Sequence, residues 1–300
     1  MIKVRVPASS ANMGPGFDCM GVALSLYSEV CIEEIDSDEV KLEVLDESKD
    51  FLPTDKRNYV YAAMERVFAE VGKKFSGYRI TIDNAIPITR GLGSSSSGIV
   101  AGLAGANYIL GNPLTDEKLL KIACDIEGHP DNVAPALFGG FVVSFVDSDE
   151  VFYIKTDVSS ELKFVALIPD FYFRTKKSRN VLPKYVSHKN AVYNVAHAAY
   201  VASAFMKGDF THIGSGIKDR LHQGYRISHI KDCDYAMRLC RRNGADACYL
   251  SGAGPTIMSI ITGDESAFEE KMNRVLQGKL RDWRLVMIRA DNSGVQVFEE

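Results

Sequence analysis

The sequence predicts an α+β protein with two domains, residues 1–155 and 156–300. Its 300 residues are enough for one large domain or two of moderate size, each with its own core. Apolar stretches with a period of two, typical of strands, are interspersed with stretches of helical period along the whole chain. Apolar residues make up 46% of the sequence and charged residues 25%, as in ordinary globular proteins.

The first half of the chain supplies both kinds of element. A strand over 3–8 leads into a stretch, 7–18, that is too rich in small and turn-forming residues for a regular element. Thr115 is a typical N-cap for a helix that Gly128 ends. The other elements predicted here are strands at 22–33, 40–44, 78–82, 141–146 and 151–155, and helices at 58–71 and 99–110.

The second half predicts strands interleaved with helices over one sheet, which is an α+β sandwich. A tight glycine turn at 252–255 joins two apolar strands; it is either a simple hairpin turn or a place where the backbone approaches a ligand or another loop. The predicted elements are strands at 162–168, 247–250, 256–261 and 284–289, and helices at 175–182, 191–206, 229–242 and 265–276.

Charge and cysteine usage argue against several classes of protein. The formal net charge of −4 argues against a general nucleic-acid partner. No apolar run reaches membrane-spanning length and the start lacks a signal-peptide layout, so we expect no membrane partner. The six cysteines form no CxxC pair, which indicates reduced thiols, a cytoplasmic location and no zinc site.

The stretch 87–98, Pro-Ile-Thr-Arg-Gly-Leu-Gly-Ser-Ser-Ser-Ser-Gly, carries the strongest functional signal. It follows a predicted strand and opens a helix, whose first backbone N–H groups have no intrahelical partner. Gly91 and Gly93 let an anion approach the backbone, and four serines add hydroxyl donors, which together predict a phosphate cradle. The lysine-bearing nucleotide loop and the dinucleotide fingerprint both fail here. An ordinary helix N-cap made of small residues is the alternative.

Glu127 stands at the C-terminal end of a predicted helix, where the helix dipole disfavours a negative charge. A cation would resolve that, and Mg²⁺ held together with a hydroxyl of the serine loop is our hypothesis, because hard cations prefer oxygen ligands. A solvated surface glutamate is the alternative. Asp131 and Asn132 follow a His-Pro turn, where such residues are also common simply because they bond their own backbone.

Two further groups of charged residues stand outside these stretches. Asp18 and Asn12 lie in the early glycine- and proline-rich loop and could anchor an ammonium and a hydroxyl or phosphate, or simply form a turn. The basic run 174–179 opens a helix, where cations are misplaced, so that an arginine of this run could hold a carboxylate or phosphate. Arg226 is a second candidate clamp for a carboxylate. A solvated basic face is the alternative for the run, and a surface ion pair is the alternative for Arg226.

In this order and combination, the stretches 7–18, 87–98 and 251–256 resemble the three motifs of the GHMP kinases, a family of ATP-dependent small-molecule kinases. The resemblance covers essentially the whole chain. The stretches 6–18, 127–135 and 175–179 are similar to the branch of the family that phosphorylates L-homoserine. The resemblance implies an N-terminal ribosomal-protein-S5-like domain with a left-handed βαβ unit and a C-terminal ferredoxin-like domain, although general rules favour a right-handed crossover.

The resemblance also implies an activity, which is transfer of the ATP γ-phosphoryl group to the hydroxyl of L-homoserine, with Mg²⁺, in threonine biosynthesis. It assigns Ser95 and Glu127 to the metal, with Ser94 or Ser96 as neighbouring possibilities, and Asn12, Asp18 and Asp131 to the amino acid and its ammonium. Arg179 and Arg226 would clamp the carboxylate, Thr175 and Asn132 would lie near the reacting hydroxyl, and Thr256 near the rim. The implied ATP-binding residues are Asn58, Arg90, Gly91, Leu92, Gly93, Ser94, Ser95, Ser96 and Ser97.

Three alternatives stay open at this point. The chain could be a GHMP kinase for another small alcohol, such as mevalonate or a sugar, or a family member that binds a ligand without catalysis. Asp131 could be a general base or a group that only orients the substrate. The resemblance is compatible with a homodimer, whereas the residues themselves do not indicate an oligomeric state.

Overall fold

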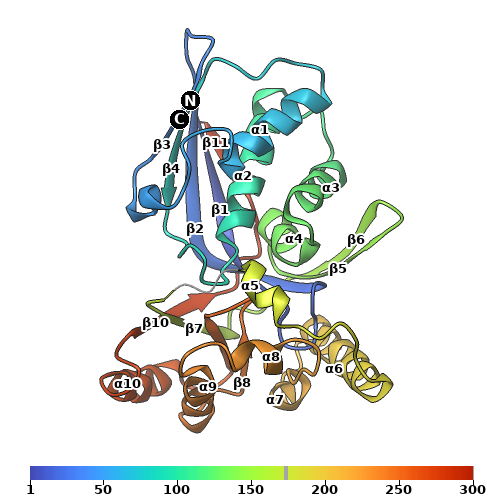
Figure 1. Cartoon of the computed structure of the whole chain (residues 1–300), viewed down its shortest axis with the longest axis vertical. Coiled ribbons are helices and arrows are strands. Elements are labelled where there is room, and N and C mark those ends of the chain that lie inside the picture. The colour runs from blue at the N-terminus through green and yellow to red at the C-terminus, as the bar shows by residue number, and fades with distance from the viewer. Residues whose placement is uncertain (172–174, 300) are drawn as a thin grey trace.

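The computed structural model describes residues 1–171 and 175–299, and its first sheet is built mainly from the N-terminal half (Figure 1). The sheet has seven strands. Its main path runs in the order β11 (Gln296–Glu299), β1 (Ile2–Ala11), β2 (Met20–Glu34), β4 (Tyr78–Asn84) and β3 (Val40–Val44). The hairpin of β5 (Phe141–Asp147) and β6 (Glu150–Thr156) extends it, because β5 pairs with the first residues of β2.

Four helices cover one face of this sheet (Figure 1). The parallel pair β3 and β4 is connected through a short 3-10 turn, η1 (Glu47–Asp50), and helix α1 (Tyr59–Glu70). Alternate apolar residues of β1 and β4, such as Val4 and Ile80, are fully buried against these helices. Period-two burial is what a sheet with one covered face requires. The other three helices are α2 (Ser94–Ile109), α3 (Asp116–Glu127) and α4 (Pro130–Phe138).

The second sheet is antiparallel, in the order β10 (Trp283–Arg289), β7 (Lys163–Pro169), β9 (Ile257–Ile261) and β8 (Ala247–Leu250). Both of its faces are buried. Val165 and Leu167 pack with α9 (Cys233–Arg242) and α10 (Glu265–Leu276), whereas Phe164 and Ala166 face a core shared with β2, β5 and helix α6. This second core joins the two sheets. The remaining helices are α5 (Thr175–Asn180), α6 (His188–Lys207), α7 (Ile213–Gly216) and α8 (Gln223–Ile227).

Most predicted elements are confirmed to within a few residues, but several points need correction. Helix α2 starts at Ser94 rather than 99, and the short helices α7 and α8 were not predicted. Strand β1 continues through 7–11, because this small-residue stretch pairs with β2 across a bulge. Asp131 and Asn132 lie in the first turn of helix α4, which Pro130 opens; proline at a first helical position loses no hydrogen bond. Helix α9 starts at Cys233 rather than 229, and α5 ends at Asn180 rather than 182.

The C-terminal segment is the largest departure from the expected layout. Strand β11 pairs antiparallel with β1, so the last residues of the predicted 156–300 unit belong to the first sheet. The two chain ends accordingly lie side by side in Figure 1. The change from the first sheet to the second occurs between β6 and β7, close to residue 155. The exact division of the chain into domains remains a prediction.

Candidate active site

A cavity of about 340 Å³ lies between the two sheets and brings together most of the residues singled out from the sequence. Ser96 and Ser97 are buried and are not part of its lining. The side chain of Thr175 lies outside the described part of the structure, as does all of Arg174 in the basic run. The predicted residues that line the cavity are Asn12, Asp18, Asn58, Arg90, Gly91, Leu92, Gly93, Ser94, Ser95, Glu127, Asp131, Asn132, Arg179 and Arg226.

The serine loop has the backbone geometry of an anion cradle. Gly91 and Gly93 have positive φ angles of 76° and 72°, and Gly93 is the N-cap of α2. The N–H of Ser97 donates to the Gly93 carbonyl at 2.9 Å, which closes the first turn. The N–H groups of residues 94–96 precede that bond and lie at the positive end of the helix dipole. This end of the cavity therefore suits a polyphosphate.

Replacing Gly93 by Ala is expected to disturb this cradle. An added Cβ would lie 2.1 Å from Ser9 Oγ and 3.2 Å from Asn132 Oδ1, and the φ of +72° is unfavourable for an L side chain by about 1–2 kcal/mol. We therefore expect Gly93→Ala to lower the melting temperature by several degrees and to raise KM for ATP at least about tenfold. The control is Gly72→Ala, which has a similar φ of +69° but open space around the added Cβ. Equal KM values for the two variants would contradict the prediction.

The second domain holds the loop from the other side. Arg90 is buried, and its Nε donates to the Pro169 carbonyl at 2.9 Å, at the end of β7. Ser251 Oγ donates to the Gly91 carbonyl at 2.6 Å, and the Thr256 N–H donates to the Arg90 carbonyl at 3.2 Å. The Arg90 side chain thus anchors the loop to β7, and its carbonyl anchors the loop to Thr256, immediately before the strand that follows the 252–255 turn. Thr256 is fully buried beneath the loop and is not part of the cavity lining.

Glu127 reaches the serine loop directly. Its Oε1 accepts hydrogen bonds from Ser95 Oγ at 2.9 Å and from Ser96 Oγ at 3.0 Å. Of these two serines, only Ser95 lines the cavity. A carboxylate and a hydroxyl at the edge of a phosphate cradle form the all-oxygen set that Mg²⁺ prefers, so the residues present fit this ion.

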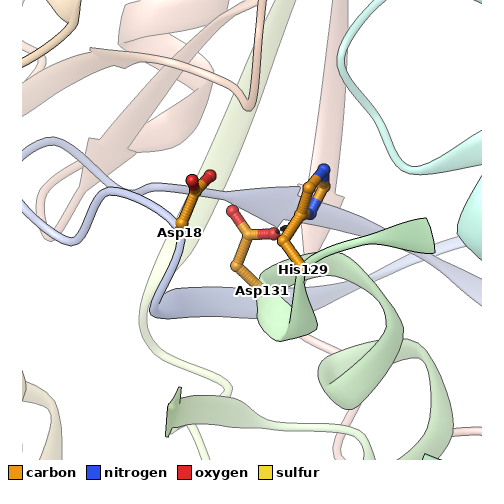
Figure 2. A group of neighbouring side chains, drawn as sticks. All are labelled: Asp18, His129 and Asp131. Carbon is orange, nitrogen blue, oxygen red and sulfur yellow. Dashed lines mark hydrogen bonds and ion pairs between the residues drawn. The ribbon is translucent and has the colours of Figure 1, made fainter. Parts of the chain in front are cut away.

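The side of the cavity next to α4 is acidic. Asp18, from the loop after β1, lies across from His129 and Asp131 at the start of α4 (Figure 2), and one ligand atom from each falls within 4.8 Å of the others. His129 Nδ1 lies 2.6 Å from Asp131 Oδ1. Burial lowers the pKa of His129, but the hydrogen bond and the charges of Asp131, Glu127 and Asp18 outweigh it, so the net pKa is raised. This cluster favours a cation such as an ammonium group.

Helices α5 and α8 contribute a basic group, Arg179 and Arg226, to the same cavity. Arg226 is 2% exposed; its Nη1 donates to His222 Nδ1 at 3.0 Å and to the Gly252 carbonyl at 3.2 Å. His222 Nε2 lies 2.8 Å from the Gly14 carbonyl, which can only accept, so Nε2 carries the hydrogen and Nδ1 accepts. Burial, followed by the charge of Arg179, lowers the pKa of Arg226 to about 10, which leaves it protonated at neutral pH.

Three asparagines of the predicted site are engaged by the chain itself. Asn12 donates to the Gly252 carbonyl at 2.8 Å and accepts from the Asp18 N–H at 3.0 Å, so it shapes the early loop. Asn58 caps α1 through the Val60 N–H and donates to the Pro53 carbonyl. Asn132 Oδ1 accepts from Ser9 Oγ at 2.9 Å, directly behind the Gly93 turn.

Four residues with a place in this site were not assigned a role from the sequence. They are Ser9, Phe17, His129 and His222. His129 offered a signal, since it stands two residues before Asp131, and His222 stands four residues before Arg226, where side chains share a helix face. The ring of Phe17 stacks on His222 and lies 5.2 Å from the Arg226 guanidinium. No pattern in the sequence around Phe17 predicts these two contacts.

Comparison with known proteins gives consistent matches over the whole chain. The model described as GHMP kinases N terminal domain matches residues 58–140, and the one described as GHMP kinases C terminal matches 201–278. Homoserine kinase of Clostridium botulinum (strain Alaska E43 / Type E3) is 46% identical over 300 residues, covering 100% of this chain and 99% of its own. That of Clostridium beijerinckii is 45% identical with the same coverage. The crystal structure of homoserine kinase from Cytophaga hutchinsonii superimposes with a TM-score of 0.89 at 28% identity, over 99% of this chain and 97% of that one.

Proposed function

The chain belongs to the GHMP kinase family, and on that premise we propose that it is an ATP-dependent kinase that converts L-homoserine to O-phospho-L-homoserine for threonine biosynthesis. The observation that carries the proposal is the layout of the cavity. A phosphate cradle lies at one end, and an acidic group and a basic group face each other near the other end. A free amino acid carries the two opposite charges that such a pair of groups would recognise, whereas mevalonate or a neutral sugar does not.

At the nucleotide end, the start of α2 would hold the phosphates of ATP with its free N–H groups and the hydroxyls of Ser94 and Ser95. Ser95 and Glu127 would hold Mg²⁺, supported by their contact at 2.9 Å. When bound, this ion would neutralise charge on the β- and γ-phosphates. Asn58 and the apolar residues Leu52 and Val60 line the cavity beyond the loop, where the adenine would lie.

At the amino-acid end, Asp18 and Asp131 would receive the ammonium, and Arg179 and Arg226 would receive the carboxylate. Holding both ends leaves the side-chain hydroxyl directed at the phosphate cradle, near Asn132. Phosphoryl transfer depends mainly on positioning and charge neutralisation. Correct placement of the two reactants supplies roughly 7–11 kcal/mol of the barrier reduction in well-oriented reactions. Thr175 remains a predicted neighbour of the hydroxyl.

A substrate panel tests the proposal. We expect ADP release, measured by a coupled assay, with ATP, Mg²⁺ and L-homoserine, and no release with mevalonate or galactose. Turnover of either alcohol without turnover of homoserine would overturn the choice of substrate. Binding of homoserine without any ADP release would instead favour a non-catalytic family member. The homodimer and the cytoplasmic location stay predictions; among the described residues, none of the helices combines the length and apolar character that a membrane span requires.

Asp131 is expected to orient the substrate rather than to act as a general base. It is 1% exposed and its Oδ1 already accepts from His129, which suits a fixed anion that receives an ammonium. We expect Asp131→Asn to raise KM for homoserine about tenfold and to lower kcat by less than tenfold, in initial rates at saturating ATP. A general base contributes about 10²–10⁴-fold, so a loss of that size in kcat alone would identify Asp131 as the base.

A further inference from the structure

The acidic and basic groups of the cavity are joined by one ion pair. Asp18 accepts two hydrogen bonds from Arg179, from Nη2 to Oδ1 at 2.8 Å and from Nη1 to Oδ2 at 3.0 Å. The pair is bidentate, the geometry in which arginine binds a carboxylate most strongly. It connects the loop after β1 with helix α5, across 161 positions of the sequence. The two side chains are only partly exposed, at 33% and 40%.

Each member of the pair belongs to one of the two charged groups. Asp18 shares its group with His129 and Asp131, whose ligand atoms lie within 4.8 Å of its own (Figure 2). Arg179 shares its group with Arg226, and both guanidinium groups lie within 6 Å of the Phe17 ring, at 5.7 and 5.2 Å. Arg179 therefore pairs with the Asp18 member of the acidic group, and Asp18 is the carboxylate that Arg179 holds among the side chains that the structure describes.

We propose that the Asp18–Arg179 pair is a specificity device that the substrate replaces by exchange of partners. This inference rests on the proposed function. The substrate ammonium takes the place of Arg179 at Asp18, and the substrate carboxylate takes the place of Asp18 at Arg179. A zwitterion thus breaks one ion pair and forms two. A molecule with a single charge breaks the same pair and leaves one of its members without a partner. Its affinity is therefore lower than the loss of one contact with the site would explain.

The exchange predicts a result that a binding site without the Asp18–Arg179 competition does not predict. If Asp18 competes with ligands for Arg179, then Asp18→Asn frees Arg179 for a lone carboxylate. The variant should lose affinity for L-homoserine and gain affinity for 4-hydroxybutyrate, which is homoserine without its ammonium. In the same way, Arg179→Gln frees Asp18, and should gain affinity for 3-amino-1-propanol, which is homoserine without its carboxylate. Loss of a substrate-binding residue would therefore improve binding of a substrate fragment.

The test is isothermal titration calorimetry with each fragment, in the presence of Mg²⁺ and a non-hydrolysable ATP analogue. We expect Asp18→Asn to bind 4-hydroxybutyrate about tenfold more tightly than the wild type does. The matched control is Asp131→Asn, which removes the same charge from the same cluster but is not paired with Arg179. This control measures the effect of lowered negative charge alone, and we expect its affinity for 4-hydroxybutyrate to rise less than threefold over the wild type. Arg179→Gln and Arg226→Gln form the corresponding pair for 3-amino-1-propanol.

The exchange would be overturned if Asp18→Asn and Asp131→Asn gained equally in affinity for 4-hydroxybutyrate, or if neither variant gained affinity. The surface variant Asp38→Asn, which removes the carboxylate of the exposed Lys74 pair, controls for the change in net charge and should match the wild type. Wild-type turnover of L-homoserine is measured separately by ADP release. Failure of that turnover would count against the proposed function, whereas the fragment affinities would still decide whether Asp18 and Arg179 compete with ligands.

Discussion

Replacing Glu127 by Gln is expected to lower kcat/KM for homoserine about 10²–10³-fold, the loss typical when one electrostatic contact to the developing charge is removed. The carboxylate is the only charged member of the proposed Mg²⁺ pair, Ser95 and Glu127. The glutamine keeps an oxygen that can accept from Ser95 and Ser96, so the variant should remain folded. Because the charge that holds Mg²⁺ is lost, the Mg²⁺ concentration for half-maximal rate should rise more than tenfold in the ADP-release assay.

The matched control is Asp125→Asn, which removes a carboxylate from an exposed position on the same helix. It should keep the wild-type rate and Mg²⁺ dependence. If Glu127→Gln retains both within threefold, then Glu127 does not hold the ion and the oxygen set of Ser95 and Glu127 has another purpose. Circular dichroism of both variants separates a loss of activity from a loss of folding.

Arg226→Met is expected to reduce kcat/KM for homoserine at least about 100-fold, mainly through KM, without destabilising the protein by a comparable amount. Removing one partner of a buried, hydrogen-bonded charge pair costs about 2–5 kcal/mol of binding free energy, partly because the ligand carboxylate is left unpaired. Without ligand, however, the acceptors of its hydrogen bonds within the described residues are all neutral: the Gly252 and Ser178 carbonyls and His222 Nδ1. Burial also lowers its pKa to about 10. An apolar side chain of similar length avoids this desolvation cost.

The measurements for this variant are KM for each substrate and the melting temperature. KM for ATP should stay within about threefold of the wild type, and the melting temperature within a few degrees. Arg238→Met, at an exposed position on α9, is the control for removing an arginine. Wild-type kinetics in Arg226→Met would exclude Arg226 as a carboxylate clamp, and a simultaneous loss of ATP and homoserine binding would indicate a structural role instead.

The nucleotide end of the site could be predicted from the sequence because its geometry is local. Gly91, Gly93 and the serines that follow are adjacent in the chain, and their residue types alone require a turn and a helix start. The amino-acid end was predicted residue by residue from a resemblance, and the cavity contains those residues except Thr175, whose side chain is not described. Ser9 and Phe17 were missed because no spacing in the sequence connects them with the site, whereas His129 and His222 were missed although each stands close in sequence to a predicted site residue.

By itself, the sequence determined most of the long elements and some of their ends. Thr115, Gly128 and the alternating strands depend on residues within a few positions of one another, and they hold in the structure. Only the tertiary structure decided which distant groups meet: the return of β11 to β1, the attachment of Arg90 to Pro169, and the pairing of Asp18 with Arg179. The physical reason is that sheet register and the packing of whole elements select long-range partners, and neither can be read from the residues within a few positions in the sequence.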